Sequence, residues 1–239
     1  MGAIYRREMG AFFTSGVAYV FLVVFYFVSG IFFFNYVVSM GVADVSPIFQ
    51  SMFLVVMFLI PILTMKLLSE EKKNRTDQGL LIAPVGLWEI VLGKYFAALT
   101  LFVIAESIVF VYAIILSAMG GVVWQTLFGN YFAMLFLGAA FIAVGLFISS
   151  LTENQITAAI VSMVVLFVIY LSEMLVSNFE NGTMLQKLLY KVITTIAFYS
   201  KYNEFTNGVF SLPSVIFFIS VAFLFNFFTV RVLEKRRWS

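Results

Sequence analysis

The sequence predicts an all-α, polytopic membrane protein, and its composition, its apolar runs and the positions of its basic residues carry that prediction. The chain has 239 residues, of which 63% are hydrophobic and 11% are charged. Soluble domains carry roughly 25% charged residues, so this chain cannot cover a soluble fold with polar surface. We therefore expect residues 1–239 to form one transmembrane domain.

The chain begins with a segment that differs from the apolar runs after it. In residues 1–15, apolar side chains such as Ile4 and Met9 alternate with Arg6, Arg7 and Glu8. This pattern predicts an amphipathic helix that lies in the membrane interface. A spanning helix needs about 20 mostly apolar residues, and six runs meet that length: 17–38, 48–68, 90–119, 127–150, 155–176 and 213–233.

Two connections between these runs carry structure of their own. Residues 177–212, between the fifth and sixth runs, contain apolar residues at helical spacing, which predicts one or two short helices that dip into the outer leaflet. Residues 69–94, between the second and third runs, hold much of the charge of the chain. Asn74 or Arg75 can begin a short helix there and Pro84 can end it.

The basic residues predict the orientation. Arg6 and Arg7 precede the first run, a larger group lies between the second and third runs, and another group follows the sixth. With six spans, all of these lie on one side of the membrane, and only Lys187, Lys191 and Lys201 lie on the other. Because basic residues accumulate on the cytoplasmic side, both termini are expected to be cytoplasmic.

Composition also excludes several chemistries. The chain has no Cys and no His, so it has no thiolate or imidazole metal ligands, and no catalysis through Cys or a Ser-His pair. We expect no catalytic, cofactor-binding or metal site in this chain, and no nucleic-acid partner.

The short helix between the second and third runs has two interpretations. A helix of eight to ten residues is marginal in water and must pack on something. It could lie on its own membrane surface, or it could dock into another protein.

A resemblance bears on this choice. The segment LLSEEKKNRTDQGLLIAPVGLWEIVLGKYFAAL resembles the connection between the second and third spans of ABC-2 type transporter permeases. The family pattern is roughly Glu-Glu-Lys, Gly-Thr, Leu-Leu, Pro-Val and then Gly-Lys at the start of the third span. In this chain, Arg75 stands where the family usually has Gly, and Ile82 where Thr is common. Three further segments are similar to the family as well: IYRREMGAFFTSGVAYV at the start of the chain, and FTNGVFSLPSVIFF and VLEKRRW near its end. Within the family, the chain most resembles the gliding-motility-associated permeases and is less similar to the copper-processing permeases.

The resemblance implies a function. The chain would be the permease subunit of an ATP-binding cassette transporter of the exporter type, in the bacterial cytoplasmic (inner) membrane. ATP and Mg²⁺ would bind to a dimer of separate ATPase subunits, because Gly93-Lys94 is followed by Tyr95 and does not complete a phosphate-binding P-loop. A second permease copy or a related permease would complete the core in the lipid bilayer, with an accessory binding or surface protein as a further partner. The short helix would be the coupling helix, with contacts to the ATPase from Glu70, Glu71, Lys72, Arg75, Thr76, Leu80, Leu81, Pro84 and Val85.

Polar residues inside the spans keep other functions open. A membrane-embedded enzyme, a receptor or a secondary transporter would need convergent polar groups, and the candidates are few: mainly Glu106, Glu173, Asn35 and Asn226. Glu106 lies near the middle of the third run with no basic residue at similar depth. It is either a neutral, hydrogen-bonded link to Ser107, Asn35 or Asn226, or a polar group facing a wet cavity on the translocation path.

Overall fold

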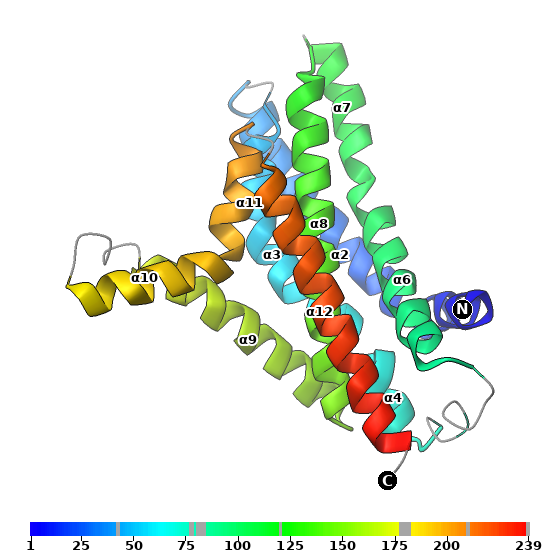
Figure 1. Cartoon of the computed structure of the whole chain (residues 1–239). Helices are drawn as coiled ribbons and strands as arrows, with labels where there is room; N and C mark the ends of the chain where they lie inside the picture. The colour runs from blue at the N-terminus through cyan, green and yellow to red at the C-terminus, as the bar shows by residue number, and fades with distance from the viewer. Residues whose placement is uncertain are drawn as a thin grey trace.

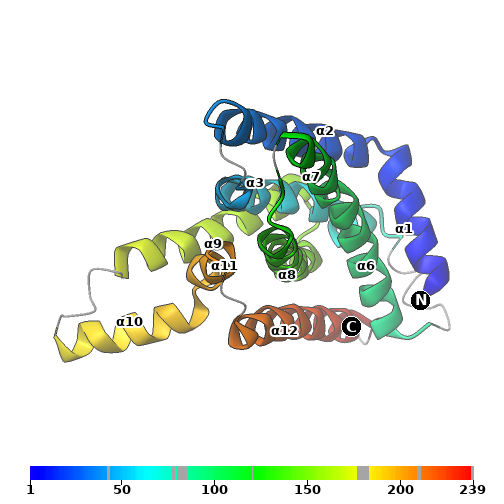
Figure 2. The same ribbon diagram turned by 90° about the horizontal axis from the view of Figure 1, so that it is seen from above.

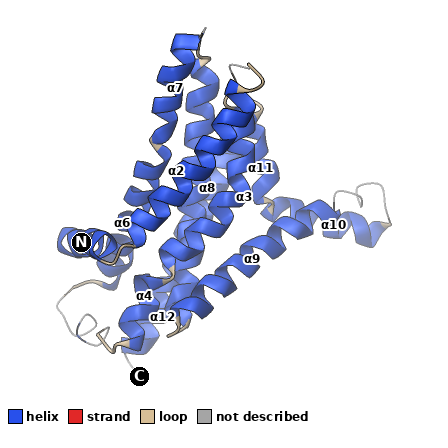
Figure 3. Ribbon diagram, turned by 180° about the vertical axis from the view of Figure 1, so that it is seen from behind, coloured by secondary structure: helices blue, strands red, loops and turns tan. Residues whose placement is uncertain are grey.

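The protein is a bundle of helices, as the sequence predicts. The computed structural model describes residues 1–41, 44–76, 79, 85–119, 121–176, 183–208 and 211–237. These residues contain helices and no strand (Figure 3). The helices are α1 (Gly2–Thr14), α2 (Val17–Phe33), the π-helix η1 (Phe34–Val38), α3 (Ser46–Thr64), α4 (Lys66–Lys73), α6 (Leu87–Glu106), α7 (Ile108–Met119), α8 (Trp124–Leu151), α9 (Gln155–Val176), α10 (Met184–Ile196), α11 (Phe198–Thr206) and α12 (Leu212–Arg237).

Six stretches of helix among the described residues are long and apolar enough to cross a membrane, which confirms the expected number. Each has a mean hydropathy of 2.2 or more over its most apolar window, far above the level of a soluble helix. The stretches are Val17–Val38, Ser46–Lys73, Leu87–Ala118, Trp124–Leu151, Gln155–Val176 and Leu212–Arg237.

Helix α8 lies at the centre of the bundle. It contacts α3, α4, α6, α9, α11 and α12, and Figure 2 shows α3, α6, α11 and α12 around it. Two glycines let its neighbours approach closely: a Cβ on Gly138 would lie 2.2 Å from Phe102 on α6, and one on Gly145 would lie 2.2 Å from Thr64 on α3. The small residues of the fourth run therefore serve close packing.

Helices α9 and α10 extend sideways from this centre. Figure 1 shows α10 projecting from the end of α9, away from α8. The two short helices α10 and α11 occupy the expected connection between the fifth and sixth runs. Thr183 and Gln186 form a capping box that begins α10, and Glu173 on α9 accepts the backbone N–H groups of Tyr199 and Ser200 at the start of α11.

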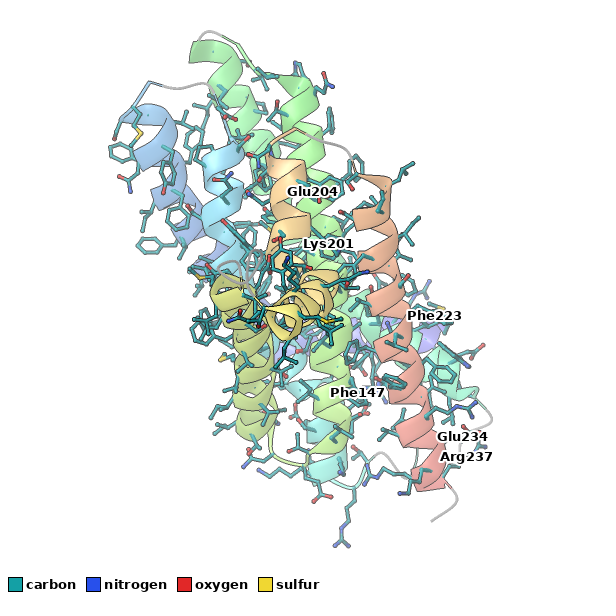
Figure 4. All side chains as sticks on the ribbon, turned by 60° about the vertical axis from the view of Figure 1, so that its left-hand side comes forward. Phe147, Lys201, Glu204, Phe223, Glu234 and Arg237 are labelled. Atoms are coloured by element: carbon teal, nitrogen blue, oxygen red, sulfur yellow. The ribbon has the colours of Figure 1, made fainter. Side chains whose placement is uncertain are left out.

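Helix α11 then returns toward α12. Figure 4 shows Lys201 and Glu204 on α11, where α11 passes the first part of α12. The Lys201 ammonium lies 4.9 Å from the centre of the Phe217 ring, and Ser214 donates a hydrogen bond to Glu204. Both charged residues are therefore held against α12 by the chain itself.

Two of the expected spans contain a turn. The third span, Leu87–Ala118, has a turn at Ser107 that divides α6 from α7, and the second span, Ser46–Lys73, has one at Met65 that divides α3 from α4. Helix α4 ends at Lys73, so Asn74 and Arg75, which were expected to begin a short helix, follow the end of α4. Most of the segment after them, at 77–78 and 80–84, lies outside the described residues.

Candidate functional site

One end of the bundle gathers charged side chains from helices that are distant in sequence. We call it the charged end: it contains α1, α4, the first turns of α6 and the last turn of α12 (Figure 1). Figure 4 marks Glu234 and Arg237 of α12 there.

A fully buried lysine lies at the centre of this end. Lys94 on α6 has 0% of its surface exposed. Its Nζ lies 2.9 Å from Oε1 of Glu8 on α1 and 3.0 Å from Oε1 of Glu71 on α4. A buried ammonium without partners would be very unfavourable, so these two carboxylates are what allows Lys94 to be buried. The lysine thereby joins α6 to both α1 and α4.

Arg7 completes the charge balance. Its guanidinium donates hydrogen bonds to Glu8, at 2.6 Å, and to Glu71. Partial burial lowers the pKa of Arg7, but hydrogen bonding and charge attraction from Glu8 and Glu71 outweigh it, so the pKa is raised. The guanidinium therefore stays charged, and two cations face two anions. We call Arg7, Glu8, Glu71 and Lys94 the four-charge cluster.

A second set of contacts fixes α4 to the central helix. The hydroxyl of Ser149 on α8 donates to the Met65 carbonyl at 3.0 Å. The same oxygen accepts the N–H groups of Leu68 at 3.2 Å and Ser69 at 3.1 Å. These groups surround the point where α3 gives way to α4, so one side chain satisfies backbone groups at the interruption.

Lys72 ties α4 to the turn after α8. Its ammonium lies 3.4 Å from the Leu151 carbonyl and 3.8 Å from a carboxylate oxygen of Glu153. Glu153 is largely exposed, so this pair contributes little to stability. It does place the α8–α9 turn beside α4.

The end of α4 has a defined geometry. The Thr76 N–H donates to the Glu71 carbonyl at 3.0 Å and the Arg75 N–H to the Lys72 carbonyl at 3.2 Å. The backbone of Arg75, the residue before Thr76, has a positive φ of 57°. This is the Schellman arrangement, in which the left-handed position is usually Gly. The structure thus explains why Gly is usual at this position in the resembling family, and it shows that Arg75 adopts the same backbone shape.

A cavity of about 490 Å³ opens beside the four-charge cluster. Six charged residues line it, with apolar and hydroxyl-bearing residues between them: Arg7, Glu8, Lys66, Glu70, Glu71 and Lys94. Three are cationic and three anionic, so the cavity has no strong preference for either sign. Among the described residues, no group of three or more acidic, His or Cys side chains is arranged to hold a metal ion. The arrangement is suited to holding helices together rather than to catalysis.

The expected coupling residues fall into three groups. Glu71 and Lys72 form ion pairs within the chain, with Lys94 and Glu153, and their contacts to an ATPase subunit stay a prediction. Glu70 is half-buried, Arg75 and Thr76 are exposed, and Val85 is half-buried. Leu80, Leu81 and Pro84 lie outside the described residues.

The polar residues expected on a translocation path are not brought together. Glu106 is fully buried, and among the described residues neither of its carboxylate oxygens has a hydrogen-bond partner. Asn35 is exposed on η1, and Asn226 on α12 donates to the Ala222 carbonyl while its own side-chain oxygen is unpaired. The hydrogen bonds that would make Glu106 a link between helices are therefore not formed in this structure.

Sequence reasoning missed the residues that assemble the charged end. The sequence indicates Arg7 and Glu8 only as polar residues of an amphipathic helix and Lys94 only as part of a motif, and it gives Ser149 no role. One signal was present: a lysine one turn inside an apolar helix needs a carboxylate nearby. The sequence does not say which of the 12 Asp and Glu residues supplies it.

The fold and the charged end define a class: a multi-pass helical membrane component, held together by ion pairs at one end. Comparison with known families identifies the family to which this membrane component belongs. The model of the ABC-2 family transporter protein matches residues 3–230, and the chain belongs to this family. It is therefore a permease subunit of an ABC transporter, a membrane transport component that associates with an ABC ATPase subunit. A search of curated proteins finds no match.

Proposed function

We propose that this chain is the permease of an ATP-driven exporter, and that its ATPase subunits bind and hydrolyse ATP with Mg²⁺ at the charged end. The attachment of α4 carries the proposal. This helix leads directly into the segment that resembles a coupling helix, and its own contacts run to α1 and α6 through the four-charge cluster and to α8 through Ser149. A displacement of that segment would move α4, and α4 cannot move without moving three other helices.

The orientation and the assembly follow from the same proposal. The charged end would face the cytoplasm, with both termini there, as the distribution of basic residues indicates. Helix α1 would lie in the cytoplasmic interface, and α10 and α11 would enter the outer leaflet. Two permease copies, or this chain and a related one, would form the path between them in a bacterial inner membrane. Within the family we infer that the chain stands nearest the gliding-motility-associated permeases, on the resemblance of its terminal segments.

A binding experiment tests both the partner and the orientation. We expect Leu80→Asp with Leu81→Asp to release the ATPase subunit that copurifies with the permease, because two charges replace the apolar stripe of the proposed coupling helix. The matched control is Leu185→Asp with Leu188→Asp on α10, where both leucines are exposed, and this variant should retain the ATPase. The readouts are the ATPase recovered with the tagged permease and the ATP hydrolysis of the complex.

The same subunit should bind to stripped inside-out vesicles and not to right-side-out vesicles. Retention of the ATPase by the Leu80 and Leu81 variant would refute the assigned docking segment. Binding to right-side-out vesicles would refute the orientation.

A further inference from the structure

Glu106 is the least explained group in the interior of the bundle. It is fully buried at the last position of α6, and both carboxylate oxygens lack a hydrogen-bond partner within the part of the chain that the structure describes. The ion pairs formed by the described residues do not include it. An ionised carboxylate in such a place would be strongly unfavourable, so the carboxyl group is neutral and carries a proton in this arrangement.

The surroundings of Glu106 are narrow and mostly apolar. It lines a small cavity of about 20 Å³ between α2, α3, α7 and α8. Helix α3 contributes only the apolar Ile48, Phe49 and Met52 to this cavity. The polar lining comes from Ser29 on α2 and Tyr112 on α7, whose hydroxyl oxygens lie 2.8 Å apart and are paired with each other.

The helix is interrupted at the same place. Ser107 separates α6 from α7, and its hydroxyl donates to the Ile104 carbonyl at 2.6 Å. The Tyr26 hydroxyl on α2 donates to that carbonyl as well, at 3.1 Å. Side chains that occupy backbone acceptors in this way are a recognised cause of helix bends. Helix α2 therefore holds both sides of the interruption, through Tyr26 on the α6 side and through Ser29 and Tyr112 on the α7 side.

We propose that Glu106 is a proton-binding site that keeps this part of the bundle closed, and that loss of its proton opens the bundle at the interruption between α6 and α7. The closed arrangement has room for about one water molecule beside the carboxyl, which is too little to hydrate a carboxylate, so it tolerates only the neutral form. A charged carboxylate needs water, which reaches it only when α7 moves away from α2. The open arrangement therefore holds one proton fewer, and raising the pH favours opening.

Other titratable groups near Glu106 do not account for such a response. Four tyrosines lie in this region, on α2, α7, α8 and α11: Tyr26, Tyr112, Tyr131 and Tyr202. Tyrosine side chains titrate near pH 10, so they keep their protons between about pH 6 and pH 8. Glu106 is then the group through which pH acts in this range.

A cysteine reporter tests the proposal in this Cys-free chain. Ser29→Cys places a thiol of nearly the same size in the cavity wall, and N-ethylmaleimide labels it only when the site opens to water. Between about pH 6 and pH 8, labelling should rise more steeply in the Ser29→Cys protein than in the same protein carrying Glu106→Gln. The ratio of the two rates should grow by up to about tenfold per pH unit, because one proton is released on opening.

The comparison removes the effect of pH on the thiol itself, since both proteins carry the same cysteine. Met134→Cys, which lines the cavity from α8, provides a second reporter in case the loss of the Ser29 hydroxyl disturbs the closed arrangement. Ala158→Cys, buried on α9 outside the cavity, should give a ratio that does not change with pH.

Equal pH dependence with Glu106 and with Glu106→Gln at both reporters would overturn the proposal. So would an absence of labelling at both reporters across this pH range, because the site would then never open. The experiment needs no ATPase subunit, so its outcome is independent of the proposed transport function.

Discussion

The four-charge cluster and Glu106 present the same problem with opposite solutions. Both place ionisable groups out of contact with water: Lys94 and Glu106 are each 0% exposed. Lys94 has two carboxylates within 3.0 Å, whereas Glu106 has no hydrogen-bond partner. Paired charges hold helices in a fixed arrangement, while an unpaired acid must be neutral and is tied to one state of its surroundings. The four-charge cluster therefore makes its end of the bundle rigid, whereas Glu106 marks a place where the packing of the helices can change.

Removal of Lys94 should produce the largest effect. Lys94→Met leaves Glu8 and Glu71 with only Arg7 between them, and breaking a buried ion pair in this way costs about 3–5 kcal/mol. The free energy of unfolding, measured by titration with a denaturing detergent, should fall by that amount. Lys73→Met, at an exposed position on α4 two residues after Glu71, is the matched control and should change little.

Two further variants sharpen this comparison. Adding Glu8→Gln to Lys94→Met should recover part of the loss, because one of the two unmatched carboxylates is then gone. Glu106→Leu should behave in the opposite way and leave stability unchanged or higher, since it removes a buried polar group that has no partner. A loss with Glu106→Leu as large as that with Lys94→Met would show that Glu106 has a partner, and the contrast would fail.

Ser149→Ala should give the next largest effect. It leaves the Leu68 and Ser69 amides without the Ser149 hydroxyl, and the Met65 carbonyl with only the Ser69 hydroxyl as a side-chain donor, at the junction of α3 and α4. Leaving buried groups of this kind unpaired costs about 1–3 kcal/mol, which the same titration would detect. Ser150→Ala is the control, because the Ser150 hydroxyl bonds only to the Phe147 carbonyl within its own helix. Equal losses in the two variants would show that α4 is not held through Ser149.

Much of the fold could be predicted from the sequence because a bilayer imposes simple rules. Span length and hydropathy identify six helices, and the family follows from the segment around Glu70-Glu71-Lys72 and Pro84-Val85. The interruption at Ser107 could not be predicted, since it depends on Tyr26 of another helix reaching the Ile104 carbonyl. The four-charge cluster could not be predicted either. Which acid meets Lys94 is decided by how α1 and α4 pack on α6, and no local pattern contains that information.

Arg75 separates the effect of backbone shape from the effect of charge, and it should give the smallest change. It lies in the left-handed region with φ of 57°, where a residue with a Cβ is strained by about 1–2 kcal/mol. Glycine removes that strain but has more freedom in the unfolded chain, so Arg75→Gly should stabilise the end of α4 by a net amount of about 0.5–1 kcal/mol. Because the Arg75 and Thr76 amides bond to the Lys72 and Glu71 carbonyls, their hydrogen exchange should slow by about two- to fivefold.

Arg75→Ala removes the charge and keeps the strain, so it should leave the exchange rate unchanged. Asn74→Gly, at a position with an ordinary φ of −86°, should speed exchange instead, since glycine there adds only flexibility. Faster exchange in Arg75→Gly would mean that the guanidinium, rather than the turn, holds the end of α4.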